Sequence, residues 1–285
     1  MALSLAEALH HATQTLQQAG IEQARLDARL LVEWATATTR LDALARPELA
    51  LTPEQGAKLD AALQRRVTGE PTHRIIGTRG FYGLDFTLST DTLEPRPDTE
   101  TLIDLVLPFL QTQANPTALD MGTGSGAIAI ALLHTVPQLR VTAVDISAGA
   151  LATARQNAAS AGVEARFTTC ESDWFASVTG RFDLIISNPP YIPHGDIAAL
   201  DKSVRDFDPL RALDGGADGL DFYRLLAAQG RRFLNPQGKI AVEIGFRQKE
   251  DVTALFTTAG FTRAAARADL GGIEPALLFS TSNSS

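Results

Sequence analysis

The chain has 285 residues, of which 45% are hydrophobic and 20% are charged, with one cysteine and a formal net charge of −8 at pH 7. At ~150 residues per domain this length predicts about two domains, and the composition excludes a disordered chain. The single Cys170 excludes an intramolecular disulfide and a cysteine-built zinc site, and we expect no metal site.

Charge and hydropathy also bear on partners and location. A net negative charge argues against tight, non-specific binding of duplex nucleic acid, because such binding depends on Lys and Arg neutralising phosphates. No apolar run approaches the ~20 residues of a membrane-spanning helix, and the N-terminus lacks the basic start of a signal peptide. We therefore expect a cytoplasmic protein with no membrane association and no stable binding of nucleic acid.

Residues 1–68 predict a small helical domain of about four helices. This segment has few glycines and prolines and is rich in Ala, Leu, Gln and Arg, which favour helices. Gly20 predicts the end of one helix, and Thr52-Pro53 predicts the start of another. By itself, the segment contains no recognisable catalytic or ligand-binding motif.

Residues 69–97 predict a β-hairpin linker between two domains. The segment is rich in Gly and Pro, and apolar residues alternate with others from Tyr82 to Leu88. The turn Pro95–Pro97 then predicts a helix just after it. Arg96, between the two prolines, could either contact a substrate or pair with a nearby acid.

Residues 98–285 predict an α/β domain. Short apolar runs alternate with helical stretches, which is typical of a parallel sheet covered by helices on both faces. The apolar runs are Ala118–Met121, Val141–Val144, Leu184–Ile186 and Ile240–Ile244. Two further strand candidates, 260–268 and 276–280, have no helix-length segment between them. They predict an antiparallel hairpin at the edge of the sheet.

A glycine-rich loop follows the first of these strands. It consists of Gly122, Thr123, Gly124, Ser125 and Gly126. Glycine allows a backbone to approach a ligand closely, and Asp145, at the tip of the next strand, can accept hydrogen bonds from ribose hydroxyls. The loop favours S-adenosylmethionine over a nicotinamide dinucleotide, because Ala127 stands where the dinucleotide fingerprint has its third glycine. Taken alone, the loop leaves open both cofactors and a turn without a ligand.

The motif Asn188-Pro189-Pro190-Tyr191 follows a buried strand candidate. In an open parallel sheet, ligands bind at the carboxyl ends of the strands, so we expect this motif beside the glycine loop. The Asn188 side-chain oxygen and the Pro189 carbonyl can accept the two N–H bonds of a planar NH2 group, and Tyr191 offers a flat wall. The motif favours alkylation of a conjugated nitrogen, although Asn-Pro is also a common turn dipeptide.

Together these motifs resemble the peptide chain release factor glutamine methyltransferases, the PrmC/HemK family. The resemblance covers nearly the whole chain. Its further motifs are Pro95-Arg96-Pro97-Asp98-Thr99-Glu100, Ser172-Asp173-Trp174-Phe175, Asp218-Gly219-Leu220 and Glu243-Ile244-Gly245. It implies an α/β fold: a class I S-adenosylmethionine-dependent methyltransferase (Rossmann-like) domain with a small N-terminal helical domain and a β-hairpin linker.

The resemblance also implies roles for individual residues. The glycine loop and Asp145 would hold S-adenosylmethionine, Trp174 would border its adenine, and Asn188 would lie near its methionine end. The catalytic residues would be Asn188, Pro189 and Tyr191, and with Pro190 they would hold the glutamine of the Gly-Gly-Gln motif in release factors. Residues 1–68 would form a substrate-docking domain.

Rival functions differ in what else they require. An adenine-N6 methyltransferase shares the Asn-Pro-Pro-Tyr motif but should carry a basic groove for nucleic acid. A nicotinamide dehydrogenase would find no hydride-transfer acid in that motif, and a non-enzymatic binding module would not need it.

The sequence departs from the family at Glu94, which replaces an apolar residue, and at Glu274-Pro275. We assign Glu243 no catalytic role from the sequence.

Overall fold

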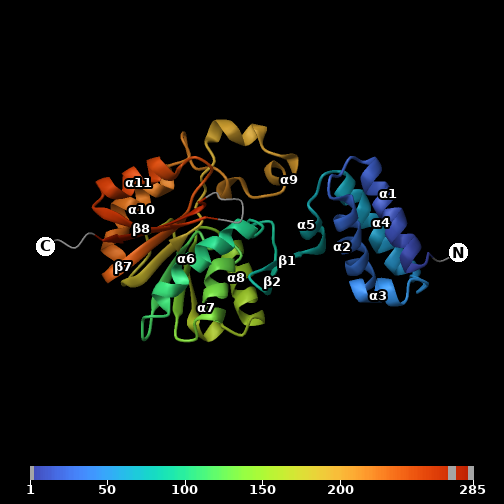
Figure 1. The fold of residues 1–285 in the computed structure, drawn as a ribbon, viewed down its shortest axis with the longest axis horizontal. Helices are drawn as coiled ribbons and strands as arrows, with labels where there is room; N and C mark the ends of the chain where they lie inside the picture. Colours follow the sequence, from blue (N-terminus) through green and yellow to red (C-terminus); the bar gives the residue numbers. More distant parts are fainter. Residues whose placement is uncertain (1–2, 269–273, 282–285) are drawn as a thin grey trace. The chain divides into compact units, whose positions relative to one another are not determined.

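The computed structural model of the protein describes residues 3–268 and 274–281. The chain divides into two compact units, Met1–Thr78 and Arg79–Ser285 (Figure 1). The first unit is helical. The second is built around a large sheet.

The helical unit contains the four helices expected within residues 1–68 and a fifth in the segment predicted as a linker. Its helices are α1 (Leu5–Gln18), α2 (Ala24–Thr36), α3 (Arg40–Ala45), α4 (Pro53–Val67) and α5 (Thr72–Ile76). Three of them begin with a capping box. At α1, the Glu7 N–H donates to Ser4 Oγ (3.3 Å) and the Ser4 N–H donates to Glu7 Oε2 (2.8 Å). Thr52 and Pro53 start α4 as expected, and an N-cap of this kind stabilises a helix by about 1 kcal/mol.

The hairpin is shorter than the predicted linker. It consists of β1 (Thr78–Phe81) and β2 (Leu84–Thr87), joined by a turn at Tyr82-Gly83. The preceding residues form α5, and Ile75 on this helix is buried in the core of the helical unit. Burial of Ile75 therefore favours a helix in a segment that the sequence analysis assigned to the β-hairpin linker.

Strands and helices alternate along the second unit. Its strands are β3 (Thr117–Met121), β4 (Arg140–Asp145), β5 (Phe167–Glu171), β6 (Phe182–Ser187), β7 (Leu234–Glu243), β8 (Phe261–Arg267) and β9 (Ala276–Thr281). Its α-helices are α6 (Glu100–Leu110), α7 (Ala127–Thr135), α8 (Ala148–Ser160), α9 (Lys202–Arg205), α10 (Asp221–Gln229) and α11 (Lys249–Thr258). A 3-10 turn, η1 (Pro97–Thr99), leads into α6 where the proline-rich turn predicts a helix start.

The seven strands lie in the order β5-β4-β3-β6-β7-β9-β8. The first five are parallel to one another, whereas β9 pairs antiparallel with both β7 and β8, so the predicted C-terminal hairpin is confirmed. From β3 the chain proceeds outward to β4 and β5, and then returns to β6 on the other side. A parallel sheet opens a ligand crevice at such a switch point, beyond the carboxyl ends of the two central strands.

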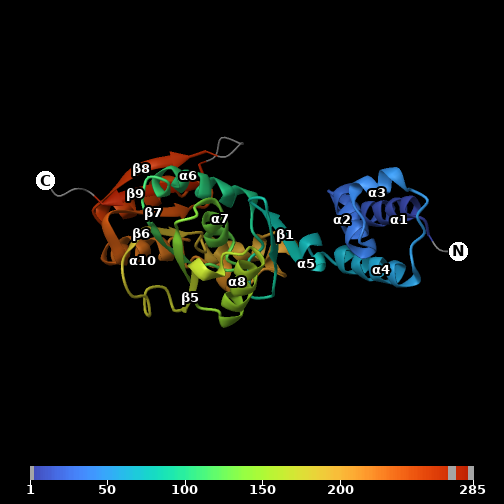
Figure 2. The ribbon, with the colours of Figure 1, turned by 90° about the horizontal axis from the view of Figure 1, so that it is seen from below.

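Helices cover both faces of the sheet, as predicted. Helices α6, α7 and α8 pack on one face, where alternate residues of β6, Leu184 and Ile186, point into the core. Helices α10 and α11 pack on the other face against Ile185 (Figures 1 and 2). Among the described residues, no helix is both long and apolar enough to span a bilayer.

Candidate active site at the carboxyl edge of the sheet

The glycine loop and Asp145 are held together by backbone donors. The loop leaves the end of β3, and Asp145 ends the neighbouring strand β4. The Gly124 N–H donates to Asp145 Oδ2 and the Ser147 N–H donates to Oδ1, both at 2.9 Å. Each carboxylate oxygen keeps a further lone pair, so Asp145 can still accept from a ligand hydroxyl.

Two glycines of the loop are required for different reasons. Gly124 has φ +54°, and a Cβ added there would meet no atom within 4 Å, so this position faces open space. Gly126 has φ +82°, and a Cβ there would lie 2.8 Å from Ile130 Cδ1 and 3.1 Å from Ala154 Cβ. Gly124 therefore leaves room beside the loop, whereas Gly126 permits close packing of α7 and α8.

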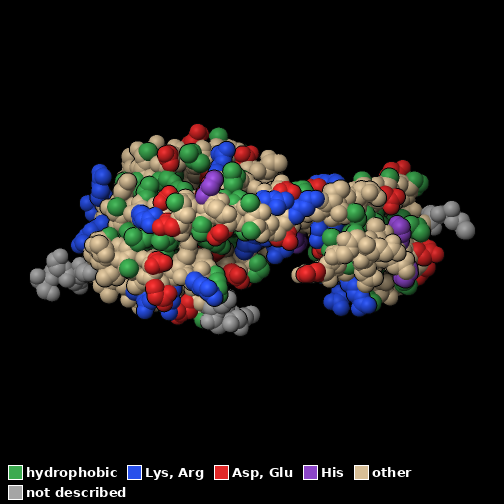
Figure 3. Space-filling view, turned by 90° about the horizontal axis from the view of Figure 1, so that it is seen from above, with side chains coloured by type: hydrophobic (Ala, Val, Ile, Leu, Met, Phe, Trp, Pro, Cys, Tyr) green, Lys and Arg blue, Asp and Glu red, His purple; other side chains and the backbone are tan. Residues whose placement is uncertain are grey.

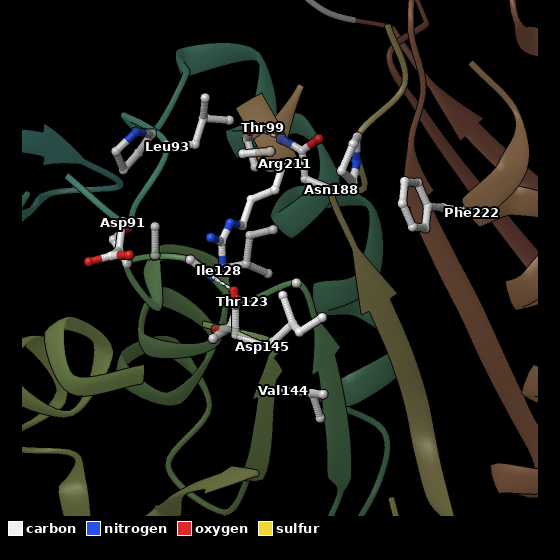
Figure 4. A pocket seen from close by; sticks show the side chains of 18 of the residues that line it. Asp91, Leu93, Thr99, Thr123, Ile128, Val144, Asp145, Asn188, Arg211 and Phe222 are labelled. Carbon is white, nitrogen blue, oxygen red and sulfur yellow. Dashed lines mark hydrogen bonds between the residues drawn. The ribbon is translucent and has the colours of Figure 1, made fainter. Parts of the chain in front are cut away.

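A cavity of about 300 Å³ lies beside the loop (Figure 4). Its volume is at the lower end of the ~300–1,000 Å³ typical of small-molecule sites. The charged residues that line it are four acids and two bases: Asp91, Glu94, Asp145, Asp173, Arg96 and Arg211. An excess of acids suits S-adenosylmethionine, whose sulfonium and ammonium groups outweigh its single carboxylate. The residues present therefore fit this cofactor.

An aromatic wall closes one side of the cavity. Trp174 and Phe222 both line it, and their ring centroids lie 4.3 Å apart at an interplanar angle of 34°. Trp174 has φ +49°, an uncommon value for a residue with a bulky side chain. The Trp174 ring thus packs against Phe222 and also borders the cavity.

Asn188 brings the reactive motif to the same cavity. Asn188 and Pro190 line it, whereas Pro189, Tyr191 and Gly126 are not among the lining residues. The Asn188 Nδ2–H donates to Thr99 Oγ1 at 3.1 Å. Within the described part of the chain, no group donates to Asn188 Oδ1 or to the Pro189 carbonyl oxygen. Both predicted acceptors are therefore without an internal donor.

Gln248 is a supporting residue that the sequence analysis missed. Its Nε2–H donates to the Tyr191 carbonyl at 3.0 Å and to the Gly219 carbonyl at 3.3 Å, and its Oε1 accepts from the Gly245 N–H at 2.9 Å. One side chain thus joins the reactive motif to the two glycine-containing motifs quoted for the family. Those motifs, 218–220 and 243–245, were the available signal that this region matters.

Two buried carboxyl groups stand at the ends of central strands. Burial raises the pKa of Asp120 on β3 to about 7, although the Thr123 hydroxyl donates to it at 2.6 Å. Burial likewise raises the pKa of Glu243 on β7 to about 7, although hydrogen bonds from Thr99 and Asn188 lower it. Neither group was assigned a role from the sequence, where an acid at a strand end gives no sign of its burial.

Ion pairs account for other charged residues whose role the sequence leaves open. Arg96 Nη2 lies 2.7 Å from Asp208 Oδ2, so Arg96 pairs with an acid while it also lines the cavity. Glu94 is buried and pairs with Arg79, which explains how a charge is tolerated at a position where the family resemblance leads us to expect an apolar residue. Arg211, also missed, extends its guanidinium into the cavity toward Thr123 (Figure 4).

The fold and the site together define a class of protein. The model of the methyltransferase small domain matches residues 97–204, and the model of the PrmC N-terminal domain matches residues 7–77. The second unit is thus a class I S-adenosylmethionine-dependent methyltransferase, with its glycine loop at the switch point of the sheet.

Similar proteins identify the family within this class. A release factor glutamine methyltransferase from Agrobacterium fabrum is 48% identical over 272 residues, covering 94% of each chain. Another from Rhodospirillum rubrum is 46% identical and covers 97% of this chain and 85% of its own. The chain belongs to the release factor glutamine methyltransferase family. A methyltransferase structure from Pyrococcus furiosus shares the fold, with a TM-score of 0.53 at 22% identity over 76% of this chain and 96% of that chain.

Proposed function

We propose that the chain transfers a methyl group from S-adenosylmethionine to the side-chain amide nitrogen of the glutamine in the Gly-Gly-Gln motif of peptide chain release factors. One observation carries this proposal beyond family membership. The Asn188 Nδ2–H donates to Thr99, so that the amide oxygen is left without an internal donor in the cavity beside the glycine loop.

Residues of two neighbouring strand ends would hold the cofactor. The loop 122–126 and Asp145 would bind its methionine and ribose parts, and Trp174 would border its adenine. When bound, the sulfonium supplies an electrophilic methyl group with a neutral thioether as leaving group. The fold contributes a cavity in which this methyl group and the substrate nitrogen meet.

Asn188 and Pro189 would act on the substrate amide. Asn188 Oδ1 and the Pro189 carbonyl would each accept one N–H bond, which fixes the NH2 plane and directs its lone pair toward the methyl group. With the cofactor bound, the N–C bond would form as the S–C bond breaks, and the nitrogen would then release one proton to water. Holding two reactants in this way can lower a barrier by as much as ~7–11 kcal/mol. No strong general base would be required before attack, because the proton can leave afterwards.

The remaining parts of the chain would serve substrate recognition. We propose that residues 1–68 help to dock the release factor, with the hairpin as a linker, and that the reaction takes place in the cytoplasm. On the face seen in Figure 3, acidic side chains occur together with basic ones on both units. With the net charge of −8, this mixture favours a protein substrate over nucleic acid.

A labelled-methyl assay tests the proposal. Purified protein is incubated with S-adenosylmethionine carrying a labelled methyl group and with unmethylated release factor, and the modified residue is located by mass spectrometry. We expect one methyl group on the glutamine of the Gly-Gly-Gln motif. Transfer to adenine in DNA or RNA, offered in a parallel reaction, would establish the adenine-N6 alternative instead. Cofactor binding without transfer to any of these substrates would reject both.

A further inference from the structure

Glu243 lies beside Asn188 although the two are 55 residues apart in the chain. Strands β6 and β7 are parallel, with Ser187 opposite Val242, so Asn188, which directly follows β6, comes next to Glu243, the last residue of β7. Glu243 is only 3% exposed, and its Oε2 has no hydrogen-bond partner among the described residues. Burying a partly unpaired carboxyl group makes the free energy of folding less favourable. Such a group next to the reactive motif therefore needs an explanation, and a role in the reaction would provide one.

The polar side chains around Glu243 favour one direction of hydrogen bonding. The Asn188 Nδ2–H donates to Thr99 Oγ1 at 3.1 Å, and the side chains of Thr99 and Asn188 lie close enough to the Glu243 carboxyl to lower its pKa. An ionised carboxylate only accepts. Because the Thr99 oxygen accepts from Asn188, the Thr99 hydroxyl has its own proton to offer to Glu243.

We propose that Glu243 is a positioning residue for methyl transfer: its buried carboxylate takes up the N–H bonds of the Asn188 amide, directly and through Thr99, so that only the amide oxygen faces the substrate NH2. This inference rests on the proposed function of Asn188. It explains why the Asn188 side chain, which could rotate to exchange its oxygen and nitrogen, would be held in the one orientation that accepts.

Protonation of Glu243 removes this constraint. A protonated carboxyl can donate, so it can drive the hydrogen-bond chain in the opposite direction and occupy Asn188 Oδ1. The charged and titratable groups around the carboxyl are Arg96, Asp98, Tyr191 and Tyr223. Burial and Asp98 raise the pKa of Glu243 to about 7, so we expect turnover to fall as pH decreases through this value.

The variant Glu243→Gln tests the inference, because glutamine both donates and accepts. We expect a kcat reduced by about tenfold or more and independent of pH between about pH 6 and about pH 8. The affinity for S-adenosylmethionine, measured by calorimetry, should stay within about twofold of wild type. Glu250→Gln, which removes an exposed glutamate on α11, is the matched control and should keep the wild-type kcat and pH profile. In an Asn188→Ala background, Glu243→Gln should cause little further loss, because the residue acts through Asn188.

Two results would overturn the inference. One is a Glu243→Gln enzyme with wild-type kcat; the other is a kcat loss that adds in full to that of Asn188→Ala. If Glu243→Gln does not fold, the wild-type pH profile decides, since a kcat that is flat between about pH 6 and about pH 8 contradicts the titration. Asp120 also has a raised pKa, so the pH profile of kcat is recorded for Asp120→Asn as well. The decrease in kcat that we attribute to protonation of Glu243 should persist in this variant. Failure of the proposed function is distinct, because the wild-type enzyme itself would then transfer no methyl group to the release factor.

Discussion

The two halves of the proposed site are built in different ways. The donor half, the glycine loop with Asp145, is held by backbone N–H groups that donate to one carboxylate over a short stretch of two adjacent strands. The acceptor half, Asn188–Tyr191, is held by side chains from distant segments, Thr99 and Gln248 among them. A cofactor site can thus be built largely from local backbone geometry, whereas a substrate-orienting site depends on tertiary contacts.

Removing the amide of Asn188 should separate the two halves most clearly. We expect Asn188→Ala to lower kcat by about 10³-fold, or ~4 kcal/mol of transition-state stabilisation, because one of the two acceptors for the substrate NH2 is lost. Binding of S-adenosylmethionine should largely survive. Turnover by the labelled-methyl assay and affinity by calorimetry check both parts.

Asn235→Ala is the matched control for this change. Asn235 donates to Asp183 Oδ1 at 2.8 Å near the opposite ends of the strands, so its loss should not affect kcat. Equal activity of Asn188→Ala and wild type would remove Asn188 from the mechanism.

A substitution at Asp120 measures how much this buried carboxyl group, when ionised, lowers the free energy of unfolding. Its folded-state pKa of about 7 lies above the ordinary value of 3.8, so its stabilising contribution is complete below pH 3.8 and is lost as pH rises through 7. Asn at this position does not titrate. The free energy of unfolding of Asp120→Asn relative to wild type should therefore increase by on the order of 3 kcal/mol from about pH 5 to about pH 8. Denaturant unfolding at both pH values measures it, and a difference that stays constant would contradict the raised pKa.

Asp145 should affect the donor half alone. We expect Asp145→Ala to weaken binding of S-adenosylmethionine by about 30-fold, since a ligand acceptor and the anchor of two backbone N–H groups are both lost. At saturating cofactor, kcat should change by less than about threefold. Asp251→Ala, which removes an exposed aspartate on α11, is the control. A large loss of kcat with unchanged affinity would show that the two halves are not separable in this way.

Gln248 should show the smallest effect, and on the acceptor half. Gln248→Ala removes the donors to the Tyr191 and Gly219 carbonyls, so the reactive loop loses a support but keeps its reactive atoms. We expect kcat to fall by about fivefold, or ~1 kcal/mol, with cofactor affinity unchanged. Gln113→Ala, at an exposed glutamine after α6, is the matched control. A loss confined to cofactor affinity would place Gln248 in the donor half instead.

Parts of the fold could be predicted because they depend on local signals. The start of α4 and the four buried parallel strands follow from the N-cap Thr52 with Pro53 and from continuous apolar runs. Strand β5 was missed, because Phe167 is its one buried residue and Thr, Cys and Glu make up the rest of this edge strand. Strand β7 begins six residues before the predicted run, at Leu234, because an irregular pairing between Phe182 and Leu184 admits Pro236 and Gly238.

The sequence alone determined which functional groups the site contains. They are a glycine loop after one strand, an acid at the end of the next strand and an Asn-Pro motif after a third strand. Their spacing predicts that all three lie at one edge of a parallel sheet. The tertiary structure decided which atoms of these groups are available. Only the pairing of β6 with β7 and the packing of η1 bring Glu243 and Thr99 against the Asn188 amide. The physical reason is that a hydrogen-bonding group has two directions, and only contacts between segments far apart in the chain select one of them.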